Sequence, residues 1–202
     1  MSYLSTPDLK KWQEIKLIAI GVSTGGPMVL QTILTNLAPH FPPIVIVQHI
    51  STGFLPTMVN WLKDTTKRNI VIATQFEPLV FDHVYFAPDN FHTGVSKRNC
   101  IYLSQDSPEN GVRPAVSYLF RSTAENFGGK AMGVILTGMG RDGVVELKKL
   151  KESGAITVAQ DKLSSIVHGM PGDAILKDAV DYVLTPLQIA ELIKKVTIEP
   201  NK

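Results

Sequence analysis

Short apolar runs alternate with helix-length segments along this chain. Runs of strand length that are apolar throughout are typical of strands buried on both faces of a sheet. They occur at residues 16–22, 44–48, 70–73, 83–87, 133–137, 156–159 and 182–184. Parallel strands need long crossovers, usually helices, so the alternation predicts a parallel sheet covered by helices on both faces.

The segments between these runs have the spacing of helices. We predict helices at residues 27–36, 54–67, 114–127, 143–153, 171–180 and 186–196. Gly154 is a typical helix stop. Residues 92–95 and 101–103 flank a polar turn and predict a β-hairpin. The expected fold is α/β: a doubly wound, mainly parallel sheet with a small β-hairpin insertion.

We divide the chain into an N-terminal extension and one domain. The extension is residues 1–15, where Thr6 and Pro7 open a short predicted helix. Residues 16–202 form the one expected domain. The 202 residues suffice for one sizeable core, and 44% of them are apolar.

Charge and cysteine content narrow the classes of function. The net charge of +2 predicts no nucleic-acid partner and no attraction to anionic lipid. No apolar stretch approaches the roughly 20 residues of a membrane helix, so no membrane insertion is expected. The single cysteine, Cys100, excludes a disulfide within the chain and fits a reducing compartment. We expect a cytoplasmic protein.

In doubly wound sheets the functional site lies beyond the carboxyl ends of the strands. The loop after the first predicted strand, residues 21–27, places Ser23 between Gly21 and Gly25 in a G-x-S-x-G arrangement. This spacing suits a sharp turn that presents a nucleophilic serine. Two alternatives remain open for this loop: a phosphate or nucleotide cradle at residues 21–26, and a plain structural turn.

The loop after the second strand carries His49 at the same edge of the sheet. Neighbouring strands lie about 4.7–4.9 Å apart, so this histidine can reach a serine at the end of the first strand. By itself, a histidine at a strand end is more often structural. Next to the serine loop it becomes a candidate general base.

A third loop, residues 138–143, contains three glycines and Asp142. The glycines indicate positive φ angles or a close backbone approach. Asp142 is a candidate N-cap of the helix that follows it, and also a candidate acceptor for His49 Nδ1–H. The N–H of Met139 is a candidate oxyanion donor.

Together the three loops predict a Ser-His-Asp triad, because such triads recur on unrelated folds. The chain order differs from the Ser, Asp, His order of the α/β-hydrolases. His92 follows another strand end and is a second candidate for the rim of the site. The remaining histidines lack the spacing of a zinc site, so neither metal nor organic cofactor is expected.

Several ordered segments resemble the CheB family of chemotaxis protein-glutamate methylesterases. The likeness extends from about Lys16 to Val196. The segments that carry it are GVSTGG from Gly21, QHI from Gln48, APDNFH from Ala87, RPAV from Arg113, TGMGRDG from Thr137, AQD from Ala159 and SSIVHGMPG from Ser164.

The resemblance implies a carboxylic ester hydrolase that removes γ-methyl esters from glutamates on chemoreceptor helices, with deamidation of certain receptor glutamines. Ser23, His49 and Asp142 match the family's serine, histidine and aspartate, and Thr24 and Met139 match residues that line its site. Three neighbours complete our expected set: Gly25 and Gly140 as lining residues and Arg113 at the rim.

The chain departs from the usual family residues at two positions. Ser117 stands where aspartate is usual, and His168 stands where tyrosine is usual. We expect these departures to affect substrate details rather than the triad. The family's receiver domain is also missing from the 202 residues, so the chain is either an unfused enzyme or the catalytic part of a longer protein. A separate regulator is then expected.

Overall fold

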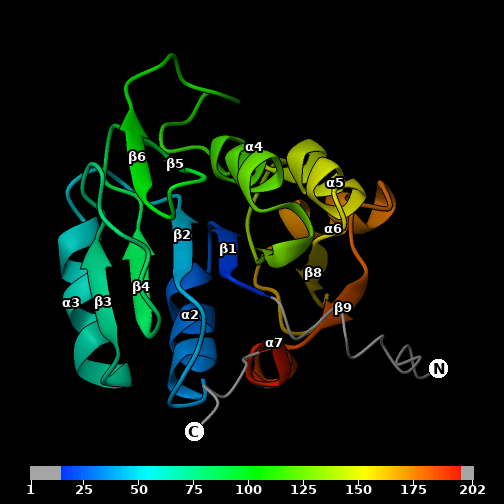
Figure 1. The fold of residues 1–202 in the computed structure, drawn as a ribbon. Helices are drawn as coiled ribbons and strands as arrows, with labels where there is room; N and C mark the ends of the chain where they lie inside the picture. Colours follow the sequence, from blue (N-terminus) through cyan, green and yellow to red (C-terminus); the bar gives the residue numbers. More distant parts are fainter. Residues whose placement is uncertain (1–14, 197–202) are drawn as a thin grey trace, which may run out of the picture.

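A computed structural model describes residues 15–196; the short helix predicted at Thr6 and Pro7 lies outside them. Seven parallel strands form one sheet in the order β3-β4-β2-β1-β7-β8-β9 (Figure 1). The strands are β1 (Leu17–Val22), β2 (Ile44–Gln48), β3 (Asn69–Ile72), β4 (His83–Phe86), β7 (Ala131–Ile135), β8 (Ile156–Gln160) and β9 (Tyr182–Leu184). The predicted parallel sheet is confirmed.

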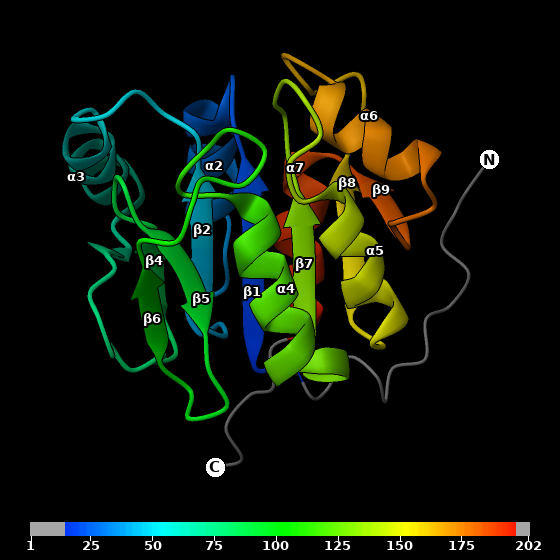
Figure 2. The same ribbon diagram turned by 90° about the horizontal axis from the view of Figure 1, so that it is seen from above.

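Helices cover both faces of this sheet (Figure 2). One face carries α2 (Gly26–Thr35), α3 (Leu55–Thr66) and α7 (Pro186–Val196). The other carries α4 (Val116–Asn126), α5 (Val144–Glu152) and α6 (Gly169–Leu176). The hairpin β5 (His92–Val95) and β6 (Ile101–Ser104) is antiparallel, as predicted, and packs beside α4.

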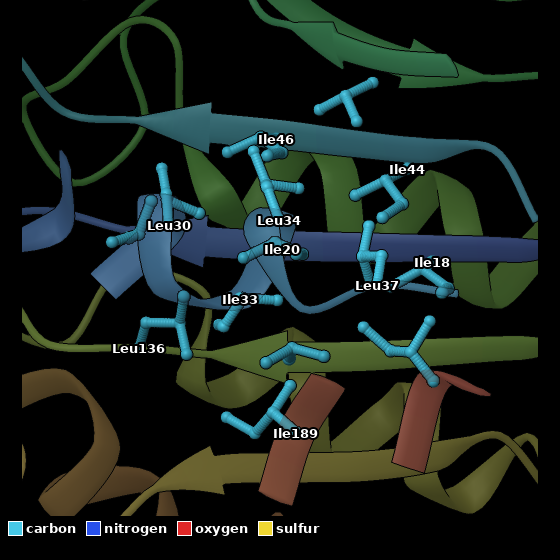
Figure 3. Packing of buried hydrophobic residues seen from close by; sticks show 14 of the residues in the cluster. Ile18, Ile20, Leu30, Ile33, Leu34, Leu37, Ile44, Ile46, Leu136 and Ile189 are labelled. Atoms are coloured by element: carbon cyan, nitrogen blue, oxygen red, sulfur yellow. The ribbon is translucent and has the colours of Figure 1, made fainter. Parts of the chain in front are cut away.

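Alternate side chains of each strand supply the two halves of the core. From β1, Ile18 and Ile20 face α2, where they meet Leu30 and Ile33 (Figure 3). Leu17 and Ala19 point to the opposite face and belong to the core cluster that includes residues of α4, α5 and α6. All six residues of β1 are buried, which explains why its sequence is apolar throughout. Among residues 15–196, none of the helices combines the length and apolarity needed to span a bilayer.

Most predicted elements differ from the structure by one or two residues at an end, and the largest differences are in β7 and α6. Strand β7 begins and ends two residues earlier than predicted. Beyond its end, Thr137 donates its N–H to the side chain of Gln160. Helix α6 begins at Gly169 rather than at Pro171. It also ends four residues earlier than predicted, and Asp178 beyond it has a left-handed φ of 52°. Gly154 follows α5 with a φ of 93°, as expected of a helix stop.

The strand order determines where the loops after neighbouring strands turn away from each other. Strand β1 lies at the centre, with β2 on one side and β7 on the other, and all three run parallel. The chain leaves β1 towards β2 and returns on the far side through β7. Such a reversal opens a crevice beyond the carboxyl ends of the central strands, where doubly wound folds bind ligands.

Candidate active site

Ser23 lies directly after β1 and before α2. Its N–H donates to Thr137 O at 3.0 Å, and its carbonyl accepts from Gln48 Nε2 at 3.0 Å. The backbone of the serine turn is therefore tied to the loops after β7 and β2. The side chain is half-buried, and within the described residues Ser23 Oγ makes no hydrogen bond.

The loop after β7 runs very close to the serine. A Cβ added to Gly138 would lie 2.6 Å from Ser23 Cβ and 2.5 Å from Met170 Sδ, closer than real Cβ contacts. Gly140 and Gly143 both have a φ of 83°. The glycines thus serve both predicted purposes: Gly138 allows a close approach, and the other two adopt conformations that side chains disfavour.

His49 follows β2 and is held through its backbone. Its N–H donates to Val22 O at 2.9 Å, and its carbonyl accepts from Gln48 Nε2 at 2.9 Å. The buried amide of Gln48 therefore joins the serine turn to the histidine loop. Sequence reasoning missed this residue, although a polar side chain closing an apolar strand was a usable signal.

Asp142 caps a helix other than the one predicted. Its carboxylate accepts the N–H of Val116 at 2.6 Å and the N–H of Ser117 at 3.1 Å, which are the first N–H groups of α4. Helix α5, which follows Asp142 in sequence, has Gly143 at its N-cap and no side-chain cap. The capping role was predicted correctly, but the helix was wrong, because a contact across 26 residues leaves no local pattern.

The imidazole of His49 faces this carboxylate. His49 Nε2 lies 3.0 Å from Asp142 Oδ2, and both side chains are largely buried. We expected Nδ1 to face Asp142, and the structure has Nε2 there instead. The two atoms are close enough for an ion pair, but their alignment does not meet the criteria of a hydrogen bond. Hydrogen bonds of catalytic groups are often loose without substrate and tighten in the complex.

Asp142 keeps its charge despite burial. Burial acts to raise the pKa of this carboxyl, but the His49 ring, the Ser117 hydroxyl and the Val116 N–H outweigh it and hold the pKa below its usual value. Hydrogen bonds to a carboxylate favour its ionised form. An ionised acceptor is what a histidine needs when it takes up a proton.

The site opens as a depression of about 530 Å³. Its lining comprises Ser23, Thr24, Gly25, Pro27, Gln48, His49, Ile50 and Ser51. Met139 and Gly140 are exposed beside it, and in the described chain the N–H groups of Met139 and Thr24 make no hydrogen bond. These N–H groups are therefore available to an oxyanion.

Two residues expected at the rim hold a loop instead. His92 is fully buried; its Nε2 lies 3.1 Å from Ser107 O, and its Nδ1 accepts the N–H of Ala115 at 3.2 Å. Arg113 Nη1 donates to the carbonyls of residues 105 and 106, at 2.9 Å each. Both side chains thus fix the loop of residues 105–113, which passes over Asp142.

The two departures from the family pattern lie in different surroundings. Ser117 is buried, and its Oγ donates to Asp142 Oδ1 at 2.7 Å. It therefore contacts the candidate triad, whereas we expected it to affect substrate details. His168 precedes α6 and lies 3.3 Å from Ser165 Oγ. Burial and then the charge of Lys162 lower the pKa of His168.

The alternative of a phosphate cradle finds little support in the glycine loop. A cradle relies on the free N–H groups of the first helical turn. Pro27 stands in that turn of α2 and has no N–H to offer. No comparison with known proteins points to nucleotide binding either.

Comparison with known proteins identifies the family of the chain. Residues 18–193 match the family model described as CheB methylesterase. The crystal structure of the Thermotoga maritima CheB methylesterase catalytic domain superposes with a TM-score of 0.85 and 38% identity, covering 89% of this chain and 98% of that one.

Two curated relatives extend the comparison to full-length proteins. A protein-glutamate methylesterase/protein-glutamine glutaminase of Geobacter metallireducens is 48% identical over 187 residues, 92% of this chain and 54% of the relative. One of Nitrosospira multiformis is 47% identical, covering 96% of this chain and 55% of the relative. The chain spans about half the length of these relatives. On this evidence it belongs to the CheB methylesterase family.

Proposed function

We propose that this protein hydrolyses glutamate γ-methyl esters on methyl-accepting chemotaxis receptors, with Ser23 as nucleophile, His49 as general base and Asp142 as the group that orients the base. One observation carries the proposal: Ser23 and His49 line the same depression at the ends of two adjacent strands, and His49 Nε2 lies 3.0 Å from the carboxylate of Asp142. The names of the curated relatives support the choice of substrate.

The chemistry divides into two steps. His49 takes the Ser23 proton as Oγ attacks the ester carbonyl, and the imidazolium is stabilised by Asp142. Because Nε2 faces Asp142, Nδ1 is the nitrogen left to accept this proton. The tetrahedral intermediate expels methoxide, which leaves as methanol with the proton from His49. Water then hydrolyses the acyl-enzyme and restores the serine.

The oxyanion of each tetrahedral intermediate needs N–H donors. In the described residues, Met139 and Thr24 have unpaired N–H groups, with Gly25 and Gly140 as small neighbours. Loss of one such donor typically costs about 10² to 10³ in rate. No step requires a metal or an organic cofactor. The same acyl-enzyme forms from a glutamine amide with loss of ammonia, so receptor glutamine deamidation belongs to the proposal.

The shape of the site favours a protein substrate. The depression is open, and exposed apolar side chains stand on the segments next to its lining: Met28 follows Pro27, Met139 follows Gly138, and Ile166 lies near Gly25. Ile166 touches the serine turn, because a Cβ on Gly25 would lie 2.8 Å from it. Exposed apolar groups around a site are typical of protein recognition. We propose that a receptor helix lies across this surface, in the cytoplasm, with a separate protein as regulator.

Release of methanol tests this function. A receptor cytoplasmic fragment with labelled γ-methyl esters is incubated with wild type, Ser23→Ala and Ser153→Ala; Ser153 is a serine of the α5 terminus that bonds Leu150 O. Wild type and Ser153→Ala should release methanol at equal rates, and Ser23→Ala only a residual amount. Ser23→Ala activity above a tenth of wild type would rule out the nucleophile.

A further inference from the structure

The carboxylate of Asp142 is surrounded by donors from two segments besides His49. Four hydrogen bonds reach it: two from the first N–H groups of α4, one from Ser117 Oγ and one from Asn110 Nδ2 at 2.9 Å. Three of the four end on Oδ1. Oδ2 receives only the Val116 N–H and faces His49. The two oxygens therefore differ in their contacts: Oδ1 is held by three hydrogen bonds, and Oδ2 faces the imidazole of His49.

The direction of the Ser117 hydroxyl is fixed by its other neighbours. Ser117 Oγ accepts the N–H of Gly143 at 3.0 Å and Asn110 Nδ2 at 3.0 Å. Two donors already point at this oxygen, so its single proton is directed to Asp142 Oδ1. The hydroxyl thus adds a donor to the carboxylate without adding a second charge.

Asn110 reaches Asp142 from an exposed turn. Its φ is 52° and that of Gly111 is 78°, which are conformations that asparagine and glycine tolerate. Glu109 and Val112 close the turn through two backbone hydrogen bonds, and Glu109 pairs with Arg121 of α4. The turn is therefore attached to the same helix whose N-terminus Asp142 caps.

From this arrangement we infer that Ser117 and Asn110 are positioning residues: they hold Oδ1 of Asp142 so that Oδ2 stays aimed at His49. The inference rests on the proposed function, because it assigns their effect to the His49–Asp142 contact. Neither residue lines the depression: Ser117 is buried, and Asn110 is exposed on the turn of residues 109–112. Their loss should lower kcat and leave KM for the receptor unchanged.

The chain supplies a matched control for each residue. Ser122 is a second buried serine of α4, and it bonds the N–H of Val95 and the carbonyl of Leu119 instead of Asp142. Asn99 is a second exposed asparagine of positive φ, 61°, and its amide bonds Leu79 O. Substitution of these two removes the same chemical groups at a distance from the carboxylate.

The experiment measures kcat and KM on the methylated receptor fragment. We expect Ser117→Ala and Asn110→Gly each to lower kcat by about 10- to 100-fold, the usual effect of losing a hydrogen bond to a charged group. KM should stay within about twofold, and Ser122→Ala and Asn99→Gly should keep the wild-type kcat. Asn110→Gly preserves the turn, so it decides the question even where Ser117→Ala folds poorly.

A double-mutant cycle separates positioning from general damage. Each substitution is repeated in an Asp142→Asn background, where the charged acceptor is gone. If the two residues act through Asp142, their effect on kcat should shrink to less than about twofold there. An undiminished effect in that background, or a wild-type kcat for both single variants, would overturn the inference.

The proposed function and the inference can fail separately. If wild type releases no methanol from the receptor, the substrate assignment fails. The same variants are then assayed on p-nitrophenyl acetate, counting only the release that Ser23→Ala abolishes. Loss of this release in Asn110→Gly but not in Asn99→Gly supports the inference. Equal release in both, or no Ser23-dependent release at all, overturns it.

Discussion

The two sides of the candidate triad differ in how firmly they are held. On one side, Asp142 is buried and accepts four hydrogen bonds from an exposed turn and a helix N-terminus. On the other, Ser23 Oγ has no hydrogen-bonding partner among the described residues and faces an open depression. His49 lines the same depression as Ser23, and its Nε2 lies 3.0 Å from Asp142 Oδ2.

This difference suggests that the Asp142 side contributes to the stability of the fold, whereas the Ser23 side contributes to reactivity. The Asp142 side is part of the folded framework, since it caps α4 and joins the loop of residues 105–113 to the sheet. The Ser23 side is fixed through its backbone, which leaves the hydroxyl free for substrate. Substitutions on the first side should therefore affect both folding and activity, and those on the second side activity alone.

The largest effect is expected at the free hydroxyl. Ser23→Ala should lower kcat by about 10⁶-fold, as loss of the nucleophile does in other triads. The free energy of unfolding should change by less than about 0.5 kcal/mol, because no side-chain hydrogen bond is lost. Methanol release and urea unfolding measure the two quantities. Clear destabilisation by Ser23→Ala would contradict the claim that the Ser23 side affects activity alone.

Asp142→Asn should act on both quantities. We expect kcat to fall by about 10⁴-fold, because the amide no longer holds the imidazole in its working form. The free energy of unfolding should fall by about 1.5–3 kcal/mol, since hydrogen bonds to a charged acceptor are lost. If stability falls but kcat does not, Asp142 is a helix cap without a role in catalysis.

A methyl group at the close approach between loops tests the backbone framework. Gly138→Ala inserts a Cβ 2.6 Å from Ser23 Cβ, so the serine must shift. We expect about a 10²-fold loss of kcat and a loss of about 1–3 kcal/mol in stability. Gly53→Ala is the control: it meets no neighbour and carries only the cost of its φ of 89°, about 1–2 kcal/mol. Equal kcat values for both variants would contradict a role for the close approach.

The smallest effect concerns acid stability. The folded-state pKa of Asp142 lies below the unfolded value of 3.8, so the carboxylate stabilises the fold above that pH. This contribution is lost as the pH falls through the folded pKa. The stability difference between wild type and Asp142→Asn should therefore shrink as the pH falls below about 4. Urea unfolding at a series of pH values measures it, and a difference that grows as the pH falls below about 4 would contradict the assignment.

Much of the fold was predictable because each strand or helix has its own pattern of apolar and turn residues. Strands β2 and β9 and helix α7 have the predicted bounds, since apolar runs and turn residues mark their ends. It was also predictable that Ser23, His49 and Asp142 lie at the same edge of the sheet. Each of them is in a loop that follows a strand, and the carboxyl ends of parallel strands all lie at one edge. The spatial order of the strands was not, because pairing such as that of β4 with β2 joins distant segments.

The support around Asp142 escaped prediction for the same reason. Asn110 and Ser117 are 32 and 25 residues away in sequence, and neither stands in a pattern that signals a hydrogen bond to a carboxylate. His92 was placed near the rim because it follows a strand end, but its ring turns inward to the loop of residues 105–113. Side-chain direction at a loop depends on tertiary packing, which local spacing does not encode.

The central claim is that both sides of the site act as one catalytic unit. Its most direct test is the residual methanol release of Ser23→Ala compared with the double variant Ser23→Ala/Asp142→Asn. Members of a triad are not additive, so once the nucleophile is removed the second substitution should have almost no further effect. If Asp142→Asn lowers the residual rate by the same factor as in wild type, the two residues act independently and the triad is refuted.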